Sequence, residues 1–330
     1  MPHFWTVAKQ PIHIDKLYQG ASAFLCCSGP SLLNQNLKPL ANCITMGVNN
    51  SPVALREHGG FSPNLWTMTD DCKNFVKSIY DDPQILKFLP DGKPNHKLFD
   101  NNAWKEVRQK VRDCPGVMYY RRPPKEREFF DPKTFLTTDE FCWGNWAQRC
   151  ACGYVRPESV KDKLCPDCGT NNRWGSRSCM LVAIRILYEL GFRKVFLLGC
   201  DFTMDANTKY AFKQDRAGGA IRNNNNTYRM LNERFDALQP VLQNAGMEVY
   251  NCFKGSGLKS FPYIEYLEAL SVSQVVPADD RTEGLYDRKA NEKAAKKAQE
   301  RDSQLSGKPR TLKEFAEARR KVVQARIERG

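Results

Sequence analysis

The sequence has no long apolar run and no secretory leader pattern. No stretch approaches the ~18 consecutive apolar residues that a transmembrane helix needs. The first 15 residues, MPHFWTVAKQPIHID, lack the basic and then apolar layout of a signal peptide. No internal repeat is visible. We therefore expect a cytoplasmic protein with no membrane partner.

The cysteine pattern argues against a secreted disulfide framework. The chain of 330 residues has 13 cysteines, an odd number, and their spacing is uneven. Reduced thiols combined with a metal site fit this pattern better. With 41% hydrophobic residues and 18 Phe, the chain has enough apolar side chains for a sizeable core, which excludes wholesale disorder.

Acidic residues are too few to balance the basic ones. There are 50 Lys and Arg against 37 Asp and Glu, which gives a net charge of +13. Such an excess favours polyanionic partners, either nucleotides or nucleic acid. Residues 279–330 hold 15 of the basic and 10 of the acidic residues, in a composition that favours helix.

Short apolar runs bounded by turn residues, with helical stretches between them, predict a doubly wound, Rossmann-like parallel sheet of the α/β class. We expect strands at 21–27, 43–48, 65–69, 116–120, 194–199 and 248–251. Helices are expected at 102–113, 177–190, 227–244 and 264–270, and a loop at 223–226. Ligands of such sheets bind beyond the carboxyl ends of the strands.

Two short cysteine pairs, each followed by glycine, predict a structural zinc ribbon. Cys150 and Cys152 are followed after twelve residues by Cys165 and Cys168. Four thiolates close a tetrahedral Zn²⁺ shell and leave no open position for catalysis. Cys142 is an alternative ligand. The predicted domains are therefore 1–141 and 175–275, two parts of one Rossmann-like domain, with a zinc insertion at 142–174 and a basic helical tail at 276–330.

Polar residues follow several of the predicted strands. After the first strand comes Ser28-Gly29-Pro30-Ser31, a turn that suits a helix N-terminus and a phosphate or ribose. Other strand ends and turns carry similar groups, at Asn49-Asn50, Asp70-Asp71, Gly175-Ser176 and Asp201. Their convergence on one edge of a parallel sheet predicts a nucleotide site there.

Five blocks in the same order resemble the bacterial CMP-sialic-acid-dependent sialyltransferases. The turn in FLCCSGPSL (24–32) also resembles that of flagellin-modification proteins and of the archaeal 6-hydroxymethylpterin pyrophosphokinase. The other blocks are GVNN (47–50), GSRSCMLVAIRILYELGFRKVFLLGCDF (175–202), TKYAF (208–212) and VYNCFKGSGLKSF (249–261). The resemblance covers roughly residues 20–270, apart from the cysteine-rich insertion.

The resemblance implies a site for a nucleotide-activated donor. By position, the residues around the nucleotide would be Ser28, Ser31, Asn49, Ser176 and Ser256. Tyr210 matches one of two family tyrosines that hydrogen-bond the leaving phosphate, and Thr203 stands where the family has the other.

This chain departs from the family at the catalytic histidine. Its only histidines are His3, His13, His58 and His96, none of which lies between 212 and 249, where the family places that residue. A carboxylate is the natural substitute as base. The candidates are Asp201, Asp205, Asp215 and Glu233, while Asp70 and Asp71 could serve as base or hold a divalent cation.

Three functions remain open from the sequence. The first is a glycosyltransferase that uses a CMP- or UDP-sugar, with an acceptor hydroxyl that could belong to nucleic acid, such as a modified DNA base. The second is a diphosphokinase-like, nucleotide-dependent transferase. The third is a non-catalytic zinc protein that binds nucleic acid. The sequence does not specify an oligomeric state.

Overall fold

The computed structural model describes residues 3–100, 105–123, 130–144, 166–167, 177–204, 210–213 and 219–273. Several predictions fall outside these residues. They concern the cysteine ligands Cys150, Cys152, Cys165 and Cys168, the tail from 276, and the site candidates Gly175, Ser176, Asp205 and Asp215. Of the helices in the described parts, none is long and apolar enough to cross a membrane.

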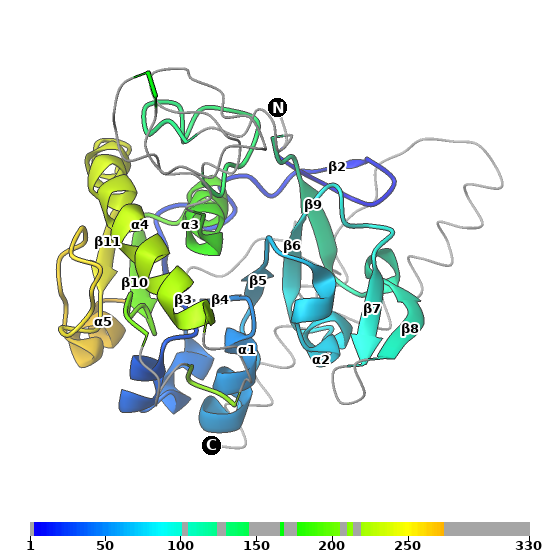
Figure 1. The fold of residues 1–330 in the computed structure, drawn as a ribbon, viewed down its shortest axis with the longest axis horizontal. Coiled ribbons are helices and arrows are strands. Elements are labelled where there is room, and N and C mark those ends of the chain that lie inside the picture. The colour runs from blue at the N-terminus through cyan, green and yellow to red at the C-terminus, as the bar shows by residue number, and fades with distance from the viewer. Residues whose placement is uncertain are drawn as a thin grey trace.

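The core of the fold is a nine-stranded, mostly parallel sheet (Figure 1). Its strand order is β11-β10-β3-β4-β5-β6-β9-β1-β2. The seven parallel strands are β3 (Ser22–Cys26), β4 (Thr45–Val48), β5 (Leu65–Thr67), β6 (Leu86–Pro90), β9 (Val117–Tyr120), β10 (Lys194–Leu198) and β11 (Glu248–Asn251). β1 (Phe4–Trp5) runs antiparallel to β9, and β2 (Pro11–Ile12) runs antiparallel to β1. The predicted α/β class with a large parallel sheet is confirmed.

Helices cover both faces of the sheet because alternate strand residues point to opposite sides. Ala23 and Leu25 of β3 belong to the core that includes α3 (Cys179–Glu189) and α4 (Gly219–Asn244). Phe24 and Cys26 of the same strand belong to a second core. That core is built with the helical segments η1 (Pro30–Asn34), η2 (Lys38–Asn42), α1 (Ser51–Ala54), η3 (Leu55–Gly59) and α5 (Tyr266–Val272).

A third core lies under β5, β6 and β9. It is centred on Trp66, Leu89 and Tyr119, and it is closed by η4 (Cys72–Asn74), α2 (Lys77–Asp81) and η5 (Val111–Asp113). A two-stranded ribbon of β7 (Lys97–Asp100) and β8 (Lys105–Lys110) packs beside it through Leu98 and Val107. The ribbon is drawn at the right of Figure 1, beside α2.

Two local predictions are wrong. The helix expected at 102–113 is the strand β8 followed by η5, because Val107 packs on the third core and Lys97 forms an ion pair with Glu106 across the ribbon. Tertiary pairing outweighs the helix propensity of this stretch. The asparagine run 223–226, expected as a loop, lies inside α4, which begins eight residues earlier than predicted.

Both edge strands of the large sheet have features that limit pairing with a further strand. At β11, the backbone of Asn251 donates to Pro262 O at 2.8 Å and accepts from Ile264 N–H at 3.1 Å, so a following segment covers the carboxyl end of this edge strand. At the other edge, β2 has two residues and begins with Pro11, which has no backbone N–H.

Lys87 is a fully buried cation in the middle of β6. Its Nζ donates to three carbonyl oxygens, those of Asp82 at 2.6 Å, Pro115 at 2.8 Å and Ile85 at 3.0 Å. The ammonium group has three N–H donors, so all of them have acceptors. Burial lowers the pKa of Lys87 to about 8. The side chain therefore ties the loops before β6 and β9 together.

We predict that Lys87→Met destabilises the protein by about 2–4 kcal/mol, because it removes three hydrogen bonds to carbonyl oxygens inside the fold. Urea unfolding measured by circular dichroism gives this value. Lys97→Met is the matched control, since Lys97 is half-exposed and its ion pair with Glu106 is worth at most ~1 kcal/mol. Equal effects of the two substitutions would contradict this role for Lys87.

Candidate functional site

The sheet reverses its order of connection between β3 and β10. From β3 the chain adds β4, β5, β6 and β9 on one side, and then crosses through α3 to β10 and β11 on the other. The carboxyl ends of β3 and β10 therefore border a topological switch point, which is where open α/β sheets bind ligands. The turn at Ser28–Ser31 follows β3, and Asp201 follows β10.

Asp201 joins these two strand ends. Its side chain is 6% exposed, and its two carboxylate oxygens accept hydrogen bonds from Ser31, one from the backbone N–H at 2.9 Å and one from the hydroxyl. Burial raises the pKa of Asp201, and the two hydrogen bonds oppose that rise. Gly29 lies directly against this pair, because a Cβ there would collide with the Asp201 carboxylate and would lie 2.6 Å from Gly199 O.

The turn after β11 is attached to the same point. The backbone oxygen of Asp201 accepts from Gly257 N–H at 2.6 Å. The hydroxyl of Ser256 donates to Cys200 O at 2.5 Å and accepts from Leu258 N–H at 3.0 Å, so its hydrogen-bonding capacity is used inside the protein. Asp201 and Ser256 together join the turns that follow β3, β10 and β11 at the switch point.

Asn49 and Asn50 follow β4 and have different roles. Asn50 is 7% exposed, and its amide group bonds both Asn74 O and Val76 N–H, which fixes the loop after β5. Asn49 has a φ of +54°. Its backbone binds Thr67 and Trp66, whereas its half-buried side chain has no protein hydrogen bond in the described structure.

The predicted catalytic and nucleotide-binding residues around the switch point thus divide into two groups. Ser31, Asn50, Asp201 and Ser256 are buried and serve the framework. Accessible side chains belong to Ser28, Pro30, Asn49, Thr203 and Tyr210. Tyr210 is brought to the turn after β3 because its neighbour Ala211 donates its backbone N–H to Ser28 O at 3.0 Å.

The loop after β10 has an anchor that the sequence reasoning missed. The side-chain amide of Asn225, in α4, bonds both backbone groups of Met204. Its oxygen accepts from the Met204 N–H at 2.9 Å, and its nitrogen donates to the Met204 carbonyl at 2.8 Å. Phe202 has a φ of +53°, and its ring stacks on Tyr228 with 4.9 Å between centroids. These contacts fix Thr203 at the site. The run of asparagines in α4 is the sequence feature that could have indicated this contact.

Asp70 lies exposed after β5, at the same edge of the sheet. Its carboxylate accepts from Asp71 N–H at 2.9 Å and from the Asn74 side chain at 3.2 Å. Asp71 caps η4 and pairs with Lys73, and hydrogen bonds and charge from Lys73 lower its pKa below the usual value despite burial. No third ligating side chain joins Asp70 and Asp71 within the described ranges.

The described cysteines are mostly core residues. Cys26, Cys72, Cys114, Cys179, Cys200 and Cys252 are buried. Cys179 is the first residue of α3, and its Sγ lies 3.5 Å from Thr67 O, which places the helix N-terminus beside the end of β5. Burial raises the pKa of this thiol, so it is not a thiolate nucleophile at neutral pH.

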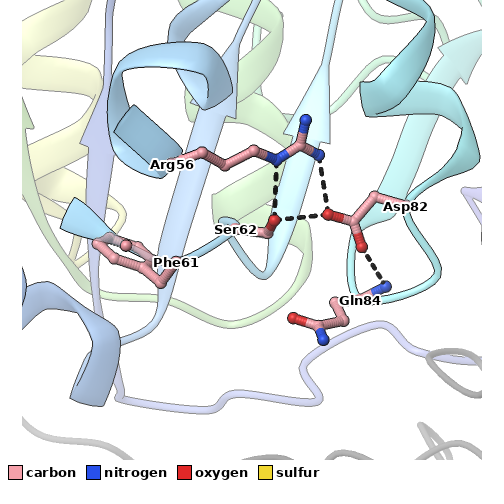
Figure 2. A pocket seen from close by; sticks show the side chains of 6 residues that line it. Arg56, Phe61, Ser62, Asp82 and Gln84 are labelled. Atoms are coloured by element: carbon pink, nitrogen blue, oxygen red, sulfur yellow. Dashed lines mark hydrogen bonds and ion pairs between the residues drawn. The ribbon is translucent and has the colours of Figure 1, made fainter. Parts of the chain in front are cut away.

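A pocket of about 300 Å³ lies elsewhere, at the amino end of the sheet. Figure 2 shows Arg56 bonded to Ser62 and Asp82, with the Asp82 carboxylate also accepting from Gln84 N–H. Arg56 further donates to the hydroxyl and carbonyl of Ser78. These groups satisfy one another and precede β5 and β6, so this pocket is separate from the switch point.

No family model and no curated protein matches the chain. Two solved structures do. One is the MAf glycosyltransferase from Magnetospirillum magneticum AMB-1, with 14% identity and a TM-score of 0.40 over 86% of this chain. The other is the sialyltransferase CstII from Campylobacter jejuni in complex with a substrate analogue, cytidine-5'-monophosphate, with 11% identity and a TM-score of 0.30.

These two likenesses are distant. This chain spans 37% of the length of the MAf structure, while the CstII match covers 74% of this chain and 85% of that one. At such TM-scores and identities the likeness says nothing about substrate or chemistry.

We predict that Asp201→Asn and Ser31→Ala each destabilise the protein by about 1–3 kcal/mol, because each leaves a buried polar group without its partner. The double variant should lose clearly less than the two single losses combined, with a coupling energy of at least ~0.5 kcal/mol. Urea unfolding of the four proteins measures this cycle.

Ser78→Ala provides the matched control for that cycle. Its hydroxyl accepts from Arg56 at the opposite end of the strands, so its effect should add to that of Asp201→Asn within ~0.5 kcal/mol. Additive effects of Asp201→Asn and Ser31→Ala would show that the two residues do not act as one unit.

Proposed function

We propose that this protein is a glycosyltransferase-like enzyme that transfers a group from a CMP- or UDP-sugar to an acceptor hydroxyl. The observation that carries the proposal is the separation of two groups of polar residues at the switch point. Ser31, Asp201 and Ser256 hold the strand ends, and this leaves Ser28 and Asn49 accessible at the same edge. The order of the five sequence blocks supports the nucleotide as ligand.

The accessible side chains suit a nucleotide. The amide of Asn49 offers two donors and an acceptor, which matches the edge of a base or the hydroxyls of a ribose. The hydroxyls of Ser28 and Thr203 offer donors to a phosphate. Tyr210, by the resemblance, donates to the leaving phosphate. Such preorganised donors stabilise the charge that develops as the donor bond breaks.

Transfer requires a base near the acceptor. A bond forms between the acceptor oxygen and the transferred carbon, the bond from that carbon to the nucleotide phosphate breaks, and the acceptor proton passes to the base. The Asp201 carboxylate is occupied by Ser31, so we assign it a positioning role. Asp70 is exposed and is our first candidate for the base or for a ligand of a divalent cation, and Asp205 is the second.

Nucleic acid is our proposed acceptor class, with the hydroxyl of a modified base as one form. The support is the net charge of +13. Two other functions predict different results. A diphosphokinase-like enzyme would consume ATP and not a nucleotide sugar. A non-catalytic protein would bind nucleic acid with a steep salt dependence and release no nucleotide.

We predict that Asn49→Gly weakens binding of CMP or UDP by at least about tenfold, because it removes the side chain and keeps a residue that accepts positive φ. Isothermal titration calorimetry measures the affinity, and nucleotide release from CMP- and UDP-sugars measures the reaction.

The matched control is Lys9→Gly, since Lys9 also has a positive φ, of 59°, and is exposed in the turn between β1 and β2. Its nucleotide affinity should equal that of the wild-type protein. If neither CMP nor UDP binds the wild-type protein, the transferase proposal fails. If both glycine variants bind equally well, Asn49 has no role in binding.

We further propose that Cys150, Cys152, Cys165 and Cys168 bind one structural zinc ion. Elemental analysis should find about one zinc ion per chain fewer in the double variant Cys165→Ser/Cys168→Ser than in the wild-type protein. Cys252→Ser, at a buried core cysteine, is the control and should keep its zinc. Full zinc content in the double variant would contradict this ligand set.

A further inference from the structure

Three ligating side chains from separate segments meet at the far end of α3 from the switch point. They are His3 before β1, Asp15 in the turn before β3, and Glu189, the last residue of α3. Nδ1 of His3 lies 3.1 Å from Asp15 Oδ1 and 3.0 Å from Glu189 Oε2. All three ligating atoms lie within 4.8 Å of one another.

The two carboxylates are held in place by further contacts. The second oxygen of Glu189 pairs with Nε of Arg185 at 2.6 Å. Arg185 is itself fully buried and donates to the carbonyls of Phe135 and Thr138. The Asp15 carboxylate accepts from the ring of His3 at 3.1 Å. Ligands of bound ions are oriented by such outer contacts.

The electrostatic surroundings of the His3–Asp15–Glu189 cluster favour a bound cation. Two carboxylates face one imidazole, and the C-terminal end of α3 adds the negative end of a helix dipole. Nothing in the proposed transferase reaction uses this cluster.

Two of the three separations match those of ligands on one metal ion. Two adjacent ligands on an ion with bonds of ~2.1 Å lie about 3 Å apart, which is the observed separation of the His3 nitrogen from each carboxylate oxygen. His3 and Asp15 are only partly buried, with side chains 20% and 31% exposed, so an ion and its remaining water ligands can enter.

We propose that His3, Asp15 and Glu189 bind a divalent first-row transition ion such as Mn²⁺ or Zn²⁺. One nitrogen and two oxygens form a donor set that both ions accept, and water completes the shell. The ion displaces the proton that His3 shares with the carboxylates, since a ligating imidazole is neutral. Bound there, it would fasten the N-terminal segment to the end of α3.

Mn²⁺ is the better probe, because it prefers oxygen and nitrogen ligands and avoids cysteine thiolates. Full-length protein is treated with EDTA, freed of chelator and titrated with Mn²⁺, and free Mn²⁺ is measured by its electron paramagnetic resonance signal. We expect one tight site per chain. His3→Gln and Asp15→Asn should each weaken it by at least about 100-fold, since each removes a ligand.

Two matched controls are available. His13→Gln changes an exposed histidine of the same segment, and Asp91→Asn changes a carboxylate with the same 31% exposure as Asp15. Both should bind Mn²⁺ like the wild-type protein. If His3→Gln does not fold, Asp15→Asn and the Mn²⁺-dependent rise in the melting temperature of the wild-type protein decide the matter.

The proposal is overturned if the wild-type protein binds no Mn²⁺ at millimolar concentration, or if His3→Gln and Asp15→Asn bind it as tightly as the controls do. Nucleotide binding at the switch point is measured separately, so a negative result here leaves the transferase proposal untouched. A tight Mn²⁺ site that is lost only in His3→Gln and Asp15→Asn supports the metal-site proposal.

Discussion

The contact between Asp201 and Ser31 is the constraint on which the rest of the candidate site depends. It joins the segments that follow β3 and β10, and these are the two strands between which the sheet changes its order. Because Gly29 lies against the same carboxylate, no side chain fits at that position without moving the pair. The turn after β11 then adds its own bonds to Asp201 and Cys200.

This arrangement has a chemical consequence. Both oxygens of the buried Asp201 carboxylate accept hydrogen bonds from Ser31, so a substrate hydroxyl could use this carboxylate only by displacing one of those bonds. Its value lies in setting the distance between Ser28 and Thr203, which stand on the two sides of the switch point. In this protein Asp201, the catalytic candidate that follows β10, is part of the framework. The accessible side chains beside it, Ser28 and Thr203, are the candidates for contact with the substrate.

Much of the sheet was predictable from the sequence, because its parallel strands are short apolar runs with polar residues at their carboxyl ends. β6 was missed, since LKFLP places a lysine and a proline in the run, and only the three carbonyls around Lys87 explain how that strand is buried. Residues 102–113 were predicted as a helix, whereas they hold the strand β8, which pairs with β7 and packs on the third core through Val107. Whether a polar residue at a strand end faces solvent or the framework depends on tertiary contacts, so Asn49 and Asn50 could not be told apart in advance.

The covered edge at β11 bears on how this protein meets other chains. An open edge strand presents unpaired N–H and C=O groups that can template the addition of another strand. Here the backbone of Pro262 and Ile264 already uses the groups of Asn251, and the two-residue strand β2 offers almost no length at the opposite edge. The sheet is therefore poorly suited to grow from one molecule into the next.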